Sequence, residues 1–340
     1  MSPRSTLERK VKRAMLDGYG RKIDYLRVSV TDRCNLRCRY CMPEEGIESS
    51  GHTSILTLEQ IARLIRVAAR IGIRKVRFTG GEPLVRKDIT KLIAEVAEIP
   101  QINDIAITTN GVLFEEKAEE LRAAGLTRVN FSLDSFDPDK FTYITRLGKL
   151  NDVYRAIAKA LEVGITPVKI NTVVMKGFND NEILDFVKLA YDMPLHVRFI
   201  EFMPIGDLPF YQKDRFVSMA EIKKIIESRY ELMQGLPLAG NGPAAYCQIK
   251  GAQGTIGFIS AMSSHFCSEC NRIRMTADGK LRGCLFDKGE INLKLALDND
   301  ASDEIITGLF CDAIRRKPYR HHMNEGWGAD NQRKMYQIGG

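Results

Sequence analysis

The stretch Cys34-Asn-Leu-Arg-Cys38-Arg-Tyr-Cys41 places three cysteines within eight residues. This spacing suits a loop wrapped around a cubic iron–sulfur cluster, because three thiolates hold three irons and leave the fourth open to a small molecule. A structural zinc site would more often use paired Cys-x-x-Cys units and fill all four positions. The stretch therefore predicts a [4Fe–4S] cluster with one reactive iron.

The cysteine stretch directly follows Tyr25-Leu-Arg-Val-Ser-Val30, an alternating and β-branched run that predicts a strand. Similar runs then alternate with helical patterns, at intervals of roughly 30 residues. The further expected strands are 75–79, 105–109, 128–132, 167–174 and 196–201, and the expected helices are 57–71, 88–98, 114–124, 151–163 and 182–191. This alternation implies right-handed βαβ units and a parallel sheet. Six units predict an α/β fold of the incomplete (β/α)6 TIM-barrel type, with a doubly wound open sheet as the alternative.

Capping signals mark individual helices. Thr57-Leu-Glu-Gln60 and Ser218-Met-Ala-Glu221 both have the form of a capping box, and Gly72 is expected to end the first helix. The barrel pattern stops after Gly206, and the expected elements beyond it are helices at 218–230 and 302–316 and a strand at 255–260. We expect an N-terminal arm over 1–20, a barrel over 21–206 and a smaller α+β appendage over 207–340 that closes the barrel opening.

Composition restricts the cellular setting. The 340 residues contain no apolar run long enough to span a membrane, and residues 1–20 are too polar for a signal peptide. We therefore expect a cytoplasmic protein without a membrane partner. Eight cysteines in such a chain favour metal or redox chemistry over disulfides. The net charge of +7 fits a polyphosphate ligand, nucleic acid or solubility alone.

Polar residues follow the predicted strands at the ends where parallel α/β folds bind ligands. Thr79-Gly-Gly-Glu-Pro83 offers two glycines that allow close backbone approach and a carboxylate, Glu82, for a cationic amine. Other strands end in Thr108-Thr-Asn-Gly111, Ser132-Leu-Asp134 and Glu201-Phe-Met203. Each segment alone could be a turn or a cap, but together with three clustered cysteines they indicate a reactive site.

Cys267, Cys270 and Cys284 form a second set, which alone could be a zinc site completed by His265 or Cys247. If the segment after Cys270 is extended, Arg272 and Arg274 point to the same side. Two guanidiniums beside a metal centre make an anion site, since arginine suits phosphate through forked hydrogen bonds.

Four more cations lie inside predicted barrel strands: Arg27, Arg77, Lys169 and Arg198. A cation in a buried strand is costly unless it is paired or faces a ligand. Structural ion pairs would explain any one of them. Four of them, with Arg272 and Arg274, indicate a polyanion inside the barrel.

The first cysteine loop, together with Gly80-Gly-Glu-Pro83, resembles the radical S-adenosylmethionine superfamily. The resemblance implies that the open iron chelates the methionine amino and carboxylate groups. An electron from the cluster then cleaves the sulfonium to give methionine and a 5′-deoxyadenosyl radical. By the same resemblance, the cofactor-binding residues are Tyr40 near the adenine, Gly81 and Glu82 on the methionine amine, Ser132 on the methionine or ribose, and Met203 on the adenine.

Both cysteine sets, the arginine pair and the terminal Gly339-Gly340 resemble the GTP 3′,8-cyclase family of molybdenum cofactor biosynthesis, from about Asp17 to Gly340. The most specific segments are 29–34, 77–83, 198–203 and 266–272. The resemblance implies a second [4Fe–4S] cluster, on Cys267, Cys270 and Cys284, whose open iron takes the guanine of GTP. It assigns GTP binding to Arg27, Arg77, Thr108, Lys169, Arg198, Arg272 and Arg274, and catalytic roles to Arg272, Arg274, Gly339 and Gly340.

The implied reaction closes a ring within GTP. The deoxyadenosyl radical takes the ribose 3′ hydrogen, the carbon radical attacks guanine C8, and an electron from the second cluster and a proton complete the cyclic product. Two four-iron clusters predict about eight irons per chain. The expected partners are GTP, a reductant protein, the next enzyme of the molybdopterin pathway and a second copy in a homodimer, but no nucleic acid.

Two other functions stay open on the sequence. A radical S-adenosylmethionine enzyme that modifies a peptide would also carry an auxiliary cluster, although it gives no reason for the basic lining. A zinc-dependent RNA-binding protein would explain the positive charge and Cys267-Ser-Glu-Cys270. That alternative predicts colourless protein and salt-sensitive RNA binding.

Overall fold

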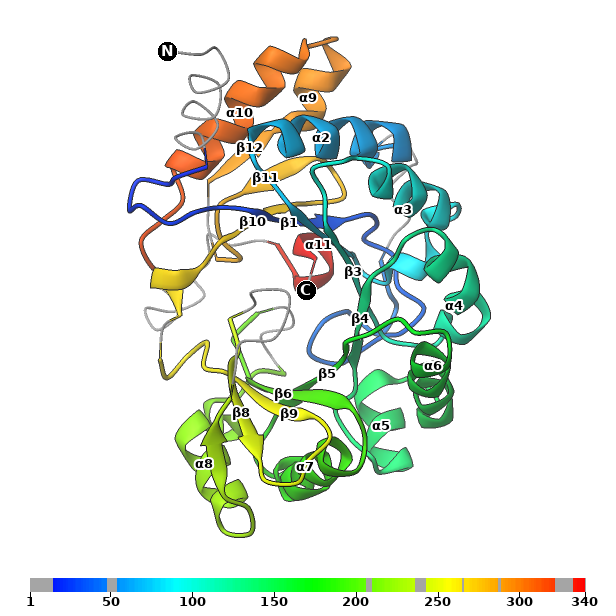
Figure 1. Ribbon diagram of the computed structural model, residues 1–340, viewed down its shortest axis with the longest axis vertical. Helices are drawn as coiled ribbons and strands as arrows, with labels where there is room; N and C mark the ends of the chain where they lie inside the picture. Colours follow the sequence, from blue (N-terminus) through cyan, green and yellow to red (C-terminus); the bar gives the residue numbers. More distant parts are fainter. Residues whose placement is uncertain are drawn as a thin grey trace.

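The computed structural model describes residues 15–47, 54–205, 210–235, 243–264, 266–286, 289–321 and 333–339. Its strands form one twelve-stranded sheet in the order β12-β11-β10-β1-β2-β3-β4-β5-β6-β9-β8-β7 (Figure 1). Most of the predicted N-terminal arm, residues 1–14 of 1–20, lies outside the described residues, and so does Gly340.

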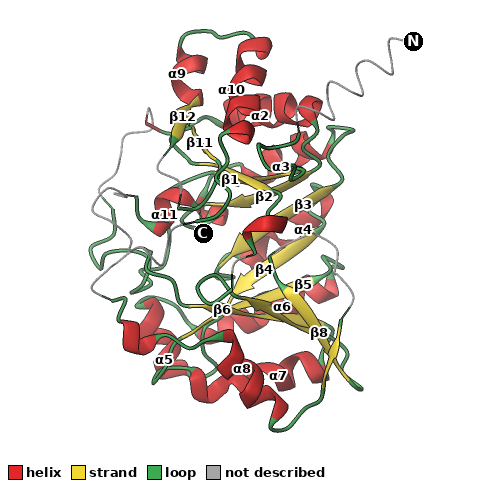
Figure 2. Ribbon diagram, turned by 90° about the vertical axis from the view of Figure 1, so that its left-hand side faces the viewer, coloured by secondary structure: helices red, strands yellow, loops and turns green. Residues whose placement is uncertain are grey.

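Six parallel strands in chain order form the centre of the sheet. They are β1 (Tyr25–Ser29), β2 (Lys75–Thr79), β3 (Asp104–Thr109), β4 (Arg128–Ser132), β5 (Val168–Val174) and β6 (Leu195–Glu201). The helices between them are α2 (Leu58–Ile71), α3 (Ile89–Ala97), α4 (Phe114–Ala123), α5 (Pro138–Thr145), α6 (Leu150–Glu162) and α7 (Ile183–Asp192). They lie outside the curved sheet (Figures 1 and 2). The incomplete (β/α)6 barrel is confirmed, and the strand order excludes a doubly wound sheet.

The C-terminal region extends this sheet at both edges. Strand β9 (Thr255–Ile259) pairs in parallel with β6, and β10 (Arg272–Met275) pairs in parallel with β1. Antiparallel strands continue outward: β7 (Leu232–Gln234) and β8 (Ala245–Ile249) beyond β9, and β11 (Lys280–Arg282) and β12 (Glu290–Asn292) beyond β10. Among the described strands, the two outermost ones do not pair, so the barrel stays open. The expected appendage therefore contributes wall strands, and the boundary at 206/207 stays a prediction.

The remaining helices are α8 (Met219–Glu227), α9 (Leu293–Asp298), α10 (Asp303–Arg315) and α11 (Met335–Ile338). Helix α8 begins at the predicted capping box of Ser218 but ends before the expected Tyr230. None of the helices in the described ranges is both long and apolar enough to cross a membrane.

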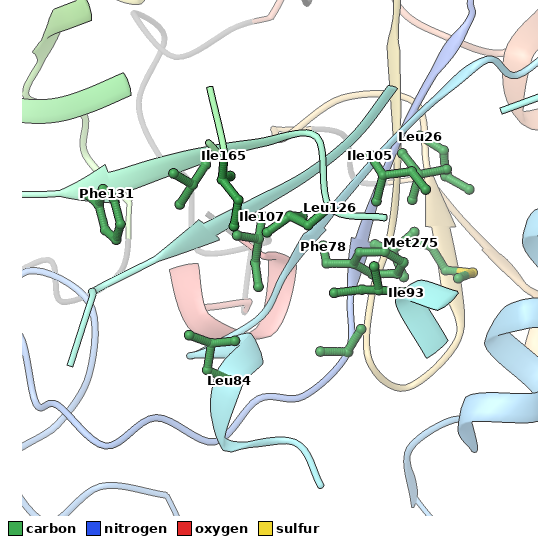
Figure 3. Packing of buried hydrophobic residues seen from close by; sticks show 14 of the residues in the cluster. Leu26, Phe78, Leu84, Ile93, Ile105, Ile107, Leu126, Phe131, Ile165 and Met275 are labelled. Atoms are coloured by element: carbon green, nitrogen blue, oxygen red, sulfur yellow. The ribbon is translucent and has the colours of Figure 1, made fainter. Parts of the chain in front are cut away.

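The apolar core lies between the sheet and the outer helices. Helix α2 begins at Thr57, whose hydroxyl accepts from the Gln60 amide, and ends at Gly72, whose φ of 118° is left-handed. Its buried face carries the predicted apolar residues Ile61, Leu64, Ile65, Ala68 and Ala69. Figure 3 shows strand residues such as Phe78, Ile105 and Ile107 packed in the same core. Helix α5 was not predicted, although Asp137 caps it and Pro138 occupies its first turn.

Because side chains alternate along strands, the opposite set faces the barrel interior. Register places Arg27 level with Arg77 on one side and with Arg274 on the other. Asn171 is level with Arg198 at the far side of the barrel. The barrel therefore collects cations at matched heights on neighbouring strands.

Glu201, at the end of β6, joins the barrel to the C-terminal region. Its fully buried carboxylate accepts hydrogen bonds from the backbone amides of Met219, Met262 and Ser263, at 3.0, 2.6 and 2.9 Å, and from the Ser263 hydroxyl. A carboxylate suits this position because every neighbour is a donor.

We expect Glu201→Gln to lower the free energy of unfolding by about 2–4 kcal/mol, because an amide nitrogen would face buried N–H donors. Denaturant unfolding, with exposed Glu119→Gln as the control, measures this effect. Equal stability of the two variants would show that the carboxylate does not hold the C-terminal region.

Candidate active site

One cavity of about 300 Å³ brings the two cysteine sets together. Cys34, Cys38 and Cys41 line it from the loop after β1, and Cys267 and Cys284 line it from the C-terminal region. Cys270 lines a neighbouring cavity of about 1,050 Å³, which shares Phe266 and Arg272 with the first. The sequence positions are far apart, so their meeting at one cavity depends on β10 pairing with β1.

The first three thiols fit a metal cluster better than they fit free thiolates. Burial raises the pKa of Cys34 to about 11 and that of Cys41 to about 12, and burial also raises the pKa of Cys38. Metal ions bind thiolates and replace the missing positive charge. Three partly buried thiols around one cavity therefore match the donor set of an iron–sulfur cluster with an open iron.

The Gly80-Gly81 pair holds the cysteine loop in place. The Gly81 amide donates to the Thr31 carbonyl at 2.8 Å, and the Glu82 amide donates to the Arg33 carbonyl at 2.8 Å. A Cβ on Gly81 would lie 2.3 Å from the Arg33 carbonyl oxygen, and one on Gly80 would lie 2.5 Å from that of Thr31. Only glycine lets this turn pack so closely on the backbone of the cysteine loop. This packing is a reason for the two glycines in addition to the predicted close approach of a ligand.

Glu82 is fixed at the cavity by three donors. Its carboxylate accepts from the Leu84 amide at 3.0 Å, the Thr109 hydroxyl at 2.8 Å and the Asn110 amide at 2.7 Å. Burial nevertheless raises its pKa to about 7. A ligand ammonium beside it would restore the ionised form, as the predicted role requires. Asn110 also donates to the Asn35 side chain at 2.8 Å, a link to the cysteine loop that the sequence did not indicate.

Tyr40, Ser132 and Met203, predicted to bind the cofactor, line the same cavity as Gly81 and Glu82. The Tyr40 hydroxyl donates to the Asp134 carboxylate at 2.7 Å, and the Val173 amide donates to the same carboxylate at 2.9 Å. Burial raises the pKa of Asp134 to about 6. Asp134 was predicted only as a polar residue after β4, and its contact with the loop tyrosine ties β4 and β5 to the cysteine loop.

The predicted GTP-binding residues Arg27, Arg77, Thr108, Arg198, Arg272 and Arg274 also line this cavity. Lys169 does not line it. It lies deeper on β5, 3% exposed, with its ammonium 5.7 Å from the Tyr246 ring. The structure therefore gathers six of the seven predicted residues and places the seventh one layer below.

Several of these side chains are buried with unused hydrogen-bonding capacity. Within the described ranges, Arg77 Nε, Arg198 Nε and Thr108 Oγ1 have no hydrogen-bond partner. Neither Arg77 nor Arg198 has a described carboxylate within 4 Å, whereas Arg128 forms an ion pair with Asp104 at 2.6 Å. An ion pair thus explains Arg128 but not Arg77 or Arg198, although Arg198 also donates to the Asn130 side chain at 2.6 Å. Orphaned buried donors of this kind fit an anionic ligand.

Burial and mutual repulsion lower the pKa of the cations. The pKa falls to about 10 for Arg77, to about 9 for Arg274 and to about 6 for Lys169. Burial is the largest cause in each case, and neighbouring cations add to it. An anion bound between these side chains would stabilise their charged forms and reduce the repulsion among them.

The C-terminal tail reaches the same place. The Arg274 guanidinium donates to the Gly339 carbonyl at 2.8 Å, and a Cβ on Gly339 would lie 2.8 Å from the Thr79 side chain. Figure 1 shows α11 near the centre of the barrel. Gly339 has a φ of 79°, so both its conformation and its surroundings favour glycine. His265 and Gly340 lie outside the described residues.

The second cysteine set has a different electrostatic setting from the first. Burial acts to raise the pKa of Cys270, but Arg272 and Lys317 outweigh it and lower the pKa to about 6. Cys247, the alternative zinc ligand, lines the larger neighbouring cavity with Cys270. Among the described side chains, no three His, Cys, Asp or Glu residues are arranged to hold a single metal ion.

Two family models match consecutive parts of the chain: the radical SAM superfamily over residues 28–190, and Molybdenum Cofactor Synthesis C over residues 195–323. A GTP 3′,8-cyclase from Syntrophomonas wolfei is 61% identical over 326 residues, which are 96% of this chain and 100% of that protein. The chain belongs to the GTP 3′,8-cyclase family. A GTP 3′,8-cyclase from Desulforamulus reducens is 51% identical over 96% of this chain and 100% of its own length.

Solved structures share the fold at lower identity. Streptococcus suis SuiB bound to its precursor peptide SuiA has a TM-score of 0.61 at 16% identity, covering 90% of this chain and 70% of that one. At this identity the likeness shows the fold alone. In this chain the first family model covers Cys34, Cys38 and Cys41, and the second covers Cys267, Cys270 and Cys284.

We expect Gly81→Ala to lower the free energy of unfolding by about 1–3 kcal/mol and to reduce iron at the first cysteine set, because its Cβ would collide with backbone. Gly308→Ala in α10 is the matched control, since its Cβ would meet nothing within 4 Å. Thermal unfolding and iron analysis after anaerobic reconstitution measure both effects. Normal iron content in the Gly81 variant would contradict the tight packing of this turn on the loop.

Proposed function

We propose that this chain converts GTP to (8S)-3′,8-cyclo-7,8-dihydroguanosine 5′-triphosphate, the first step of molybdenum cofactor biosynthesis. One observation carries the proposal: a single cavity is lined by the first cysteine set, by Cys267 and Cys284 of the second, and by arginines whose buried Nε atoms have no described hydrogen-bond partner. Such a cavity can hold a nucleotide with its base toward one metal centre and its phosphates among cations.

A [4Fe–4S] cluster on Cys34, Cys38 and Cys41, with S-adenosylmethionine bound, supplies a 5′-deoxyadenosyl radical. The chain's own residues hold the reactants near one another and keep water away. Glu82 is oriented by its three donors to accept the methionine ammonium, and Tyr40 is held by Asp134 beside the loop. Ser132 and Met203 complete the binding surface for the cofactor.

The second cysteine set would hold the other [4Fe–4S] cluster, on Cys267, Cys270 and Cys284, against the guanine. Arg27, Arg77 and Arg198 would neutralise the triphosphate. Arg274 is oriented by the Gly339 carbonyl, so the tail and the arginine would act together on the nucleotide. Arg272 shares the inner face of β10 with Arg274 and would act beside it.

We further propose four features on the strength of the family resemblance. A separate protein reduces the clusters, since the reaction needs an electron that GTP does not supply. The enzyme acts as a homodimer in the cytoplasm. It passes its product to the next enzyme of the molybdopterin pathway.

Two alternatives give different results in the same assays. A peptide-modifying enzyme shares the fold, as the SuiB structure illustrates, but the buried arginines that line the cavity favour a small polyanion over a peptide. An RNA-binding protein needs cations on an outer face, whereas Arg27, Arg77 and Arg198 are each less than 9% exposed. Anaerobic incubation with GTP, S-adenosylmethionine and reductant should yield 5′-deoxyadenosine and the cyclised nucleotide. Consumption of a peptide but not of GTP would overturn the proposal.

Replacing Arg272 and Arg274 together by alanine should weaken GTP binding by at least about tenfold per lost charge-assisted contact, while S-adenosylmethionine cleavage stays possible. Equilibrium binding of GTP and the yield of 5′-deoxyadenosine measure the two effects separately. Lys188→Ala, at an exposed ion pair on α7, is the control. Unchanged GTP affinity in the double variant would remove their assigned role.

Lys169 should make GTP binding depend on pH. Its pKa is about 6 in the protein alone, and a nearby triphosphate would favour the ammonium and raise that pKa. Binding then takes up a proton, so affinity should fall as pH rises above about 6, by up to about tenfold per unit from this group. Calorimetry of the anaerobic holoenzyme at several pH values measures the slope.

Lys169→Met is the comparison for this slope, because the γ-phosphate of GTP titrates in the same range in both proteins. The variant should bind GTP more weakly near pH 6 and show a flatter profile. Identical slopes for the two proteins would mean that Lys169 takes no part in binding.

A further inference from the structure

We infer that Lys317 is a positioning residue for the second cysteine set, which fixes Cys270 relative to Cys284 and raises the reduction potential of the cluster bound there. This inference rests on the proposed second cluster. Lys317 lies two residues after the end of α10, outside both cysteine motifs.

The contacts of Lys317 connect both arms of the second set. Its ammonium donates to Cys270 Sγ at 3.4 Å, to the Arg272 carbonyl at 2.9 Å and to the Gly283 carbonyl at 2.7 Å. Gly283 directly precedes Cys284, and Arg272 follows Cys270 by two residues. One side chain therefore spans the two segments that must hold the same cluster.

The surroundings of the Lys317 ammonium favour an anionic sulfur at Cys270. Lys317 is 2% exposed, and across the described residues no carboxylate lies within 4 Å of its ammonium. A buried ammonium is costly without a counter-charge. Among the described contacts of Lys317, the Cys270 sulfur alone can become an anion, as a metal-bound thiolate does.

The segment of Lys317 is itself held against the cysteine loop. Arg21 donates to the Cys267 carbonyl at 2.6 Å and also to the carbonyls of Pro318 and Tyr319, at 2.6 and 3.0 Å. A buried ion pair with Asp17 at 2.5 Å orients the Arg21 guanidinium. Arg21 thus holds the backbone that follows Lys317 against the cysteine loop, which places the Lys317 ammonium beside the Cys270 sulfur.

A hydrogen bond and a positive charge at a cluster sulfur stabilise the reduced cluster, which carries one more negative charge than the oxidised one. Lys317 would therefore make the second cluster easier to reduce by an external one-electron donor. The first cluster has no described lysine contact of this kind on Cys34, where the sulfur is approached by the Leu36 amide and the Asn110 side chain. The two clusters would differ in potential for this reason.

The test uses the full chain with Cys34, Cys38 and Cys41 replaced by alanine, so that only the second cluster gives a signal. We expect about four irons in this background and at least a tenfold fall in the equilibrium constant for one-electron reduction on Lys317→Met. For one electron this is about 60 mV toward negative potential. Redox titration followed by electron paramagnetic resonance measures it, and Lys317→Arg, which keeps the charge, should restore much of the shift.

Arg21→Met is the control for simple loosening, because its guanidinium bonds go to Asp17 and to main-chain carbonyls rather than to a thiol. Full iron content with an unchanged potential in Lys317→Met would overturn the inference. Loss of iron in Lys317→Met but not in Lys317→Arg would support the positioning role, whereas a shift of potential in Arg21→Met as large as that in Lys317→Met would count against a specific effect of the ammonium on the sulfur. No iron in the three-alanine background would overturn the second cluster itself, and this inference with it.

Discussion

Like charges brought together inside the barrel are the constraint on which the site depends. Register sets Arg274, Arg27 and Arg77 level on three adjacent strands, and Arg198 faces them from β6. Burial of such groups opposes folding unless something else compensates. The apolar layer between sheet and helices supplies that compensation, so a well-packed exterior permits an electrostatically unfavourable interior. The interior is then prepared for a polyanion before one arrives.

The same logic distinguishes the two cysteine sets. At the first set burial dominates and raises the pKa values of the thiols, although Arg37 partly offsets this effect at Cys34. At the second set, Arg272 and Lys317 lower the pKa of Cys270. Cys270 therefore differs in its electrostatic environment both from the first set and from Cys267, whose pKa burial raises.

Much of the barrel could be predicted from local patterns. Six strands and five of the six intervening helices follow from alternation and from capping residues such as Thr57 and Gly72, because these signals lie within a few residues. Strand β10 and its pairing with β1 could not be foreseen, since the partners are almost 250 residues apart and the segment is four residues long. Short strands carry too few side chains for a period to emerge.

The residues that were predicted from their chemical type lie mostly at one cavity, whereas residues that act through a long-range contact were not predicted. The cysteines, Glu82 and the strand arginines could be identified in the sequence from their residue type and position. Lys317, Arg21 and Asp134 look like ordinary polar residues until their partners Cys270, Cys267 and Tyr40 are seen beside them. A hydrogen bond between residues far apart in the chain cannot be recognised from a single sequence.

The pairing of β9 and β10 on opposite edges has a consequence for biosynthesis. Strands β1 and β6 leave the ribosome with unpaired backbone groups along one side, and such edges are prone to join those of other chains. Only the last third of the chain covers them, with β9 on β6 and β10 on β1. The segments that carry the second cysteine set and its neighbouring strands therefore also protect the nascent sheet, and a chain truncated before Thr255 would expose both edges at once.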